Sequence, residues 1–142
     1  MDEKQIVQRL QDHAPEFLSM FGARFVAANP VAKTCAITFE ISRDFCHSGD
    51  VIQGGFVTAM LDSAMTHAAF AAGDSGITNL SSLEIKTSYL EAARAGSLRA
   101  EGTVVKSGYK LAFLEGRLYD AQDTLVATAS SVAKLLRSDV TP

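Results

Sequence analysis

The chain has 142 residues, of which 47% are hydrophobic and 20% are charged, with a formal net charge of −3. This length suits one domain over residues 1–142 with a core of its own, and the acidic balance argues against a nucleic-acid-binding surface. The charged start of the chain and the lack of about 18 consecutive apolar residues lead us to expect a cytoplasmic protein with no secretory signal and no membrane span.

The first part of the chain predicts a helical segment and two strands. Residues 1–22 form the helical segment, in which Pro15 kinks or splits an amphipathic helix because proline lacks a backbone N–H. A short strand over 23–28 and a second strand over 33–41 follow. The second alternates apolar and polar side chains, which is typical of a half-buried antiparallel strand. Residues 42–52 predict a polar loop.

A long helix over residues 53–72 is the centre of the expected fold. Gly54 and Gly55 open this helix, and Gly73 ends it, since glycine is common just after a helix C-terminus. Its apolar residues point nearly all round the axis, so its surroundings must bury it on most sides. In a chain of this length, only a sheet curled around the helix could do so.

Four further strands complete the prediction. They are expected over residues 80–90, 97–105, 109–119 and 124–136, with a tight hairpin at Lys106, Ser107 and Gly108 and a loose tail over 137–142. Within the first of them, alternation places Leu83 and Ile85 on one face and Ser82 and Glu84 on the other. Short connections imply antiparallel neighbours, so we expect an α+β fold with one antiparallel sheet around one helix.

A single carboxylate, Asp62, interrupts the apolar helix. At about 100° per residue, it shares a polar stripe with Thr58 and Thr66. It is either a solvated or hydrogen-bonded helix residue or a functional group, because an unpaired buried carboxylate is costly. The free N–H groups of a helix that starts at Gly54 and Gly55 could hold a carbonyl oxygen that becomes an oxyanion, although glycine pairs also occur simply as turns.

Gly54 and Asp62 are too far apart to act on one carbonyl carbon within a single chain. They are eight residues apart, which corresponds to a rise of about 12 Å, and the backward lean of the side chain recovers only a few ångströms. Either the two groups do not act together, or Asp62 of one subunit faces Gly54 of another across a two-fold axis. We favour the second arrangement.

The two cysteines, Cys35 and Cys46, give no sign of a metal site or of a disulfide framework. Cys46 and His47 are adjacent, but two ligands do not hold zinc and no second pair follows. We therefore expect neither a metal nor a redox cofactor.

A curled antiparallel sheet around a long helix that begins with Gln53-Gly54-Gly55 and carries Asp62 resembles the hot-dog-fold acyl-CoA thioesterases. The phenylacetate-degradation type is the most similar, and the resemblance covers residues from about 25 to 136. It implies a hot-dog fold and hydrolysis of an acyl-CoA thioester. It also implies an active site shared between the subunits of a homo-oligomer, which is a dimer or a homotetramer formed as a dimer of dimers.

The resemblance assigns catalytic roles to the long helix and to the strand after it. Asp62 matches a carboxylate that acts as the nucleophile or as the base for water, and Gly54 matches a backbone N–H that polarises the thioester carbonyl. Ser82 matches a hydroxyl that helps to hold the water, and Thr66 a further hydroxyl seen in some members. Ser81 competes with Ser82 for this role, since a shift of one residue would exchange their faces.

The family motif has His-Gly-Gly and, six residues earlier, an Asn, where this chain has Gln53 and His47. Gln53 either takes part in catalysis or only caps the helix entry, and His47 is either a substrate contact or a plain loop histidine. The substrate-binding residues implied by the resemblance are His47, Gly55, Lys106, Ser107, Gly108 and Lys110. The two lysines, with Arg99, would contact the nucleotide phosphates of coenzyme A or would form a solvated edge. His67 is expected to be a packing or surface residue.

These observations lead us to expect an acyl-CoA thioesterase that releases a free acid and coenzyme A. The alternative is a non-catalytic acyl-CoA-binding hot-dog protein, and the presence of Asp62 favours the enzyme. A hot-dog dehydratase is a third possibility, but the pattern expected for it, an aspartate with a catalytic histidine near the helix entry, is not evident.

Overall fold

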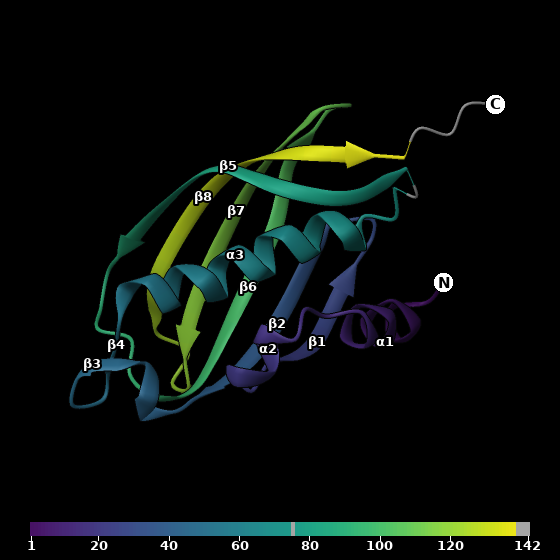
Figure 1. Cartoon of the computed structure of the whole chain (residues 1–142). Helices are drawn as coiled ribbons and strands as arrows, with labels where there is room; N and C mark the ends of the chain where they lie inside the picture. Colours follow the sequence, from purple (N-terminus) through teal and green to yellow (C-terminus); the bar gives the residue numbers. More distant parts are fainter. Residues whose placement is uncertain (75, 139–142) are drawn as a thin grey trace.

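A six-stranded antiparallel sheet curls around one long helix, as the sequence predicts (Figure 1). The computed structural model describes residues 1–74 and 76–138. The sheet strands are β1 (Arg24–Asn29), β2 (Thr34–Ile41), β5 (Ile77–Tyr89), β6 (Gly96–Ser107), β7 (Leu111–Asp120) and β8 (Leu125–Arg137). Their spatial order is β1-β2-β6-β7-β8-β5, so β1 and β5 are the two edges. This is the expected α+β, hot-dog arrangement.

The N-terminal segment folds as two helices, α1 (Glu3–Asp12) and α2 (Phe17–Met20). Asp2 caps α1: its side chain accepts a hydrogen bond from the Gln5 backbone N–H at 2.8 Å, and the Asp2 backbone N–H donates to the Gln5 side-chain oxygen at 3.0 Å. The predicted interruption at Pro15 falls between the two helices. Among the described residues, no helix combines the length and the apolar character needed to cross a membrane.

Residues 42–52 are more ordered than the predicted polar loop. They contain a 3₁₀ turn, η1 (Arg43–Phe45), and a small antiparallel pair, β3 (Cys46–Ser48) and β4 (Val51–Ile52). The prediction missed this hairpin because strands of two or three residues show no alternation. Its anchors are Phe45, whose ring meets those of Phe21 and Phe56 edge-on, and the buried Ile52.

The central helix α3 (Gly54–Ala71) begins and ends where the sequence predicts. Gln53 is its N-cap, and Gly73 adopts a left-handed φ of +79° just after it. Ten of its residues are buried, on most sides of the axis. At β6 the Gly102 backbone packs directly against the backbone of Ala64, leaving no room for a Cβ.

Strand boundaries differ from the prediction mainly at hairpins and ends. The strand β5 begins at Ile77, three residues early, and the β6–β7 turn is made by Gly108–Lys110 rather than by 106–108. The Gly108 N–H donates to the Leu111 carbonyl at 2.8 Å and closes this turn. The predicted tail begins later, because Arg137 ends β8; residues 139–142 of it lie outside the described residues.

A β-bulge in β5 overturns the alternation expected for that strand. The register against β8 shifts between Ser82 and Glu84, and Leu83 is 58% exposed instead of buried with Ile85. A bulge adds one residue and so reverses which residues face the core. As a result Ser82 lies on the same face as Thr87, and both hydroxyls bond to side chains of α3.

The contact between Gly102 and Ala64 predicts a large cost for any side chain at this glycine. In Gly102→Ala the new Cβ would lie 2.1 Å from the Ala64 carbonyl oxygen, a backbone atom that moves only if α3 moves away from the sheet. We expect a loss of about 3 kcal/mol or more, which lowers Tm by about 6–12 °C in thermal unfolding. The control Gly108→Ala, whose Cβ would lie 3.8 Å from the Leu111 carbonyl oxygen, an ordinary van der Waals distance, should lower Tm much less. Equal effects of the two variants would contradict this account of the packing.

Candidate active site

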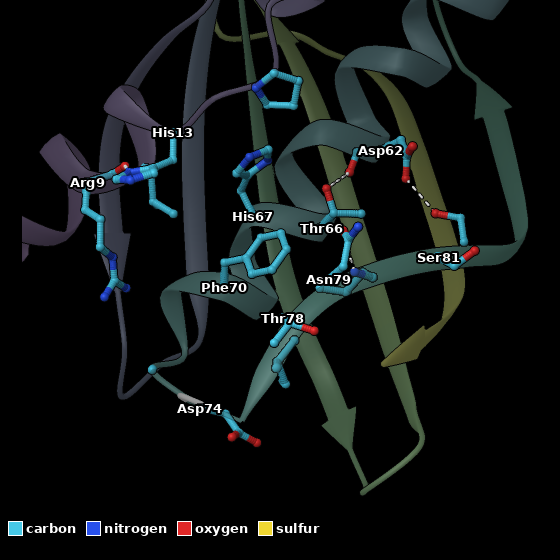
Figure 2. Close-up of a pocket in the computed structure, with 16 residues that line it drawn as sticks. Arg9, His13, Asp62, Thr66, His67, Phe70, Asp74, Thr78, Asn79 and Ser81 are labelled. Atoms are coloured by element: carbon cyan, nitrogen blue, oxygen red, sulfur yellow. Dashed lines mark hydrogen bonds between the residues drawn. The ribbon is translucent and has the colours of Figure 1, made fainter. Parts of the chain in front are cut away.

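A cavity of about 1000 Å³ lies between the end of α1, the second half of α3 and the start of β5 (Figure 2). Asp62 and Thr66 border it from α3, and Ser82 borders it from β5. Arg9 and His13 of α1 form part of the opposite wall. Such a space is large enough for the reacting part of a small-molecule substrate.

Asp62 is the chemically distinctive group of the cavity. It is half-buried in the middle of α3, and its Oδ1 accepts a hydrogen bond from the Ser82 hydroxyl at 3.1 Å. Burial raises the pKa of Asp62 above its ordinary value, while the Ser82 hydrogen bond and the nearby His67 partly offset this shift. A carboxylate with a raised pKa is a stronger base toward water than a solvated one.

Thr66 borders the cavity but uses its proton elsewhere. Its hydroxyl donates to the Asp62 backbone carbonyl at 3.0 Å and, more weakly, to that of Ser63 at 3.3 Å. Such bonds to the preceding turn are common for threonine in helices. Thr66 therefore offers a substrate or water only the lone pairs of its oxygen.

His67 lines the cavity, which the sequence did not predict. It is 9% exposed, and its Nδ1 lies 2.7 Å from the Ser63 carbonyl, to which it donates. Phe25 and Phe70 contact the ring edge-on, and burial lowers the pKa of His67. It packs, as expected, but it also borders the cavity on the side toward His13 (Figure 2). At five residues from Asp62 it shares no helix face with it, so helical spacing gives no signal.

The start of α3 presents one open backbone donor. The Gln53 side-chain Oε1 accepts from the Gly55 N–H at 2.7 Å, so Gln53 serves as the helix cap and occupies that donor. The Gly54 N–H has no hydrogen-bond partner among the described residues. Gly54 itself has no side chain that could cover this N–H, which lies at the positive end of the α3 dipole.

One chain brings some of the predicted catalytic residues together and leaves others apart. Asp62, Ser82 and Thr66 share the cavity, whereas Gln53 and Gly54 are not among the described residues that line it. The helical rise of about 12 Å between Gly54 and Asp62 stands, because α3 is a continuous helix.

The predicted substrate-binding residues also lie away from this cavity. His47 is an exposed residue of β3, and its Nδ1 lies 2.7 Å from the Ser48 hydroxyl. Lys106, Ser107, Gly108 and Lys110 lie at the exposed β6–β7 hairpin. This hairpin packs beside the end of β8, where the Leu135 N–H donates to the Lys110 carbonyl at 2.8 Å.

Comparison with known proteins places this geometry in a family. The sequence profile of the thioesterase superfamily matches residues 49–127, more than half of the chain. The chain belongs to the thioesterase superfamily. It is a thioester hydrolase with the expected hot-dog fold. No curated protein sequence matches the chain significantly.

Solved structures agree with this assignment. A phenylacetic acid degradation-related protein from Ralstonia eutropha JMP134 is 25% identical, with a TM-score of 0.81 over 91% of this chain and 98% of that one. The PaaI protein of the Escherichia coli phenylacetic acid degradation operon is 14% identical (TM-score 0.81, 95% and 94% covered). A thioesterase from Haemophilus influenzae is 15% identical (TM-score 0.79, 99% and 96% covered). The predicted likeness to the phenylacetate-degradation type is confirmed.

The raised pKa of Asp62 predicts a pH-dependent effect on stability. Because the folded state favours the protonated carboxyl, ionisation of Asp62 destabilises the fold as pH rises through its folded pKa. Asp62→Asn keeps an acceptor for Ser82 and removes the charge, so it should melt above the wild type at pH 7, by about 2–4 °C for each kcal/mol relieved.

This advantage should shrink near pH 3, where the wild-type carboxyl is protonated in both states. Thermal unfolding of the wild type and of Asp62→Asn at pH 7 and pH 3 measures this difference in Tm. Asp44→Asn, which removes the charge of an exposed carboxylate, is the control. A lower Tm for Asp62→Asn at pH 7 would contradict the burial account.

Proposed function

We propose that this thioesterase hydrolyses an acyl-CoA or aryl-CoA thioester to the free acid and coenzyme A, with Asp62 as its catalytic carboxylate. The observation that carries the proposal is a half-buried Asp62 that faces a cavity, accepts from Ser82 and has a raised pKa. A perturbed carboxylate in a cavity is typical of a catalytic base or nucleophile.

Two reaction sequences fit these groups. As a general base, Asp62 takes a proton from water, and the hydroxide adds to the thioester carbon to give a tetrahedral oxyanion. Collapse of this oxyanion breaks the C–S bond and releases the coenzyme A thiolate, which takes up a proton. As a nucleophile, the Asp62 carboxylate displaces the thiolate and forms a mixed anhydride, which water then hydrolyses. In either sequence Ser82 holds the carboxylate or the water, and no metal or redox cofactor takes part.

We propose that the Gly54 N–H of a second subunit stabilises the oxyanion. This N–H has no hydrogen-bond partner among the described residues, and the rise of about 12 Å keeps it away from Asp62 of its own chain. A two-fold dimer would form two equivalent sites, each with Asp62 from one chain and Gly54 from the other. In a dimer or dimer of dimers, Lys106 and Lys110 would reach coenzyme A phosphates bound to a neighbouring subunit.

The catalytic role of Asp62 is tested by turnover of a panel of aliphatic and aromatic acyl-CoAs. Asp62→Asn should lower kcat by several powers of ten, that is by roughly 10³-fold or more, because it removes both the base and the nucleophile. Asp44→Asn should keep the wild-type rate. Release of the thiol can be followed with a chromogenic disulfide. If Asp62→Asn turned over at near the wild-type rate, the carboxylate mechanism would be wrong, and binding without turnover by the wild type would favour the acyl-CoA-binding alternative.

The shared site is tested by mixing two inactive chains. Asp62→Asn removes one half of a site, and Gly54→Val obstructs the other, because a side chain there meets Tyr89 and blocks the approach to the N–H. A co-expressed mixed dimer contains one site with both lesions and one with neither, so it should recover up to about half of the wild-type activity per dimer.

Differently tagged chains allow the mixed dimer to be purified, and circular dichroism checks that each variant folds. If Gly54→Val does not fold, the smaller Gly54→Ala replaces it. A folded mixed dimer without recovered activity would argue for a site built within one chain.

A further inference from the structure

The first turn of α3 is joined to the end of β5 by a cluster of three side-chain hydroxyls. The Tyr89 hydroxyl donates to the Gly54 carbonyl at 2.8 Å and lies 3.0 Å from the Thr58 hydroxyl, which lies 2.8 Å from that of Thr87. Figure 1 shows the end of β5 beside the start of α3. The reaction sequences above use none of these hydroxyls.

The direction of the hydrogen bonds in this cluster follows from the number of protons. A carbonyl only accepts, so the single Tyr89 proton goes to Gly54. Thr58 must then donate to the Tyr89 oxygen, and Thr87 must donate to Thr58. The hydrogen bonds therefore all run in one direction, from Thr87 to Thr58 to Tyr89, and the last is donated to the Gly54 carbonyl. Each hydroxyl polarises the next along this series.

This series of hydrogen bonds ends on Gly54, the residue that carries the open N–H. Glycine is the most flexible residue, and Gly54 is free to turn about both backbone bonds unless its two flanking peptide groups are fixed. The preceding peptide is held through the Gln53 carbonyl, which accepts from the Phe56 N–H at 3.0 Å. The following peptide is held at its N–H by the Gln53 side chain, and its carbonyl, which belongs to the first turn of α3, accepts a further hydrogen bond from Tyr89.

Tyr89 also lies close to the space that a side chain on Gly54 would enter. A Cβ on Gly54 would lie 3.0 Å from the Tyr89 hydroxyl oxygen and 3.2 Å from its Cζ. The ring would therefore have to shift by a few tenths of an ångström to admit even a methyl group. In the single chain, Tyr89 is 55% exposed, so the bulk of the ring is not required to fill the core. Its hydrogen bonds, rather than its burial, tie it to α3.

We propose that Tyr89, supported by Thr58 and Thr87, is a positioning residue that fixes the Gly54 N–H for the developing oxyanion. This inference rests on the proposed function, because it assumes that Gly54 polarises the thioester carbonyl. Preorganised donors stabilise a transition state because they need not reorient when charge appears. Tyr89 itself does not contact the reacting atoms; it acts through the Gly54 peptide.

Tyr89→Phe tests this role because it removes only the hydroxyl. Loss of a whole oxyanion donor costs about 10²–10³ in kcat, so loss of its support should cost less, about tenfold, with KM changed by less than about twofold. The matched control is Tyr119→Phe, on β7, whose ring contacts Arg99 and whose hydroxyl makes no hydrogen bond to the described residues. This control should keep the wild-type kcat.

A spectroscopic measurement separates positioning from a merely structural effect. With a ¹³C-labelled thioester carbonyl bound to the slow Asp62→Asn enzyme, the infrared carbonyl stretch should shift to lower frequency than in solution. Adding Tyr89→Phe should reduce this shift while the acyl-CoA still binds. Thr58→Val should have a smaller effect of the same kind, and combining it with Tyr89→Phe should add little, since both belong to one hydrogen-bonded unit.

The outcomes distinguish this inference from the function on which it rests. If the wild type hydrolyses no thioester, the proposed function fails. If the wild type is active and Tyr89→Phe keeps both its kcat and its carbonyl shift, the positioning role is overturned. If Tyr89→Phe lowers both kcat/KM and Tm but leaves the carbonyl shift unchanged, the positioning role is also overturned, because Tyr89 would then be a purely structural residue. Thr58→Val, which leaves the ring in place, provides the same readouts should Tyr89→Phe fold poorly.

Discussion

Burial of a helix that is apolar on nearly every side is the constraint on which this structure depends. The sheet must wrap α3 closely enough for two backbones to touch, which is possible only where β6 carries a glycine, Gly102, against Ala64. Because α3 cannot shift without losing this contact, every side chain along it has a fixed place relative to β5. The helix is thus a rigid support on which functional groups can be set at both ends of the same element.

Asp62 is the one carboxylate of α3, and its surroundings show how the fold accommodates it. The carboxylate lies where the wrapping is incomplete, at a cavity between α1 and β5, and a serine from the edge strand provides its hydrogen bond. Partial burial raises its pKa without the full penalty of an isolated charge in the core. The same opening that reduces this penalty leaves the carboxylate accessible from the cavity, so stability and access have a common structural origin.

The sequence predicted the long-range plan better than the local detail. Periodicity was sufficient for α3, for the alternating strand β2 and for the antiparallel sheet, because each is long enough to repeat. It was insufficient for β3 and β4, and for His67, which enters the cavity through its position relative to α1 rather than through its spacing from Asp62. The hydrogen bonds of Tyr89 were also beyond prediction, since they join residues 35 and 31 positions apart.

The bulge at Leu83 has a consequence for how this sequence can vary. Ser82 lies before the bulge and Thr87 and Tyr89 lie after it, yet all three hydroxyls reach α3. The identity of residue 83 therefore matters little to these bonds, because its own side chain points to the surface, whereas its presence matters a great deal. Deleting one residue here would turn either the serine or the two later hydroxyls toward the outer face of the sheet. As far as these three hydrogen bonds are concerned, position 83 should tolerate substitution and resist any change in length.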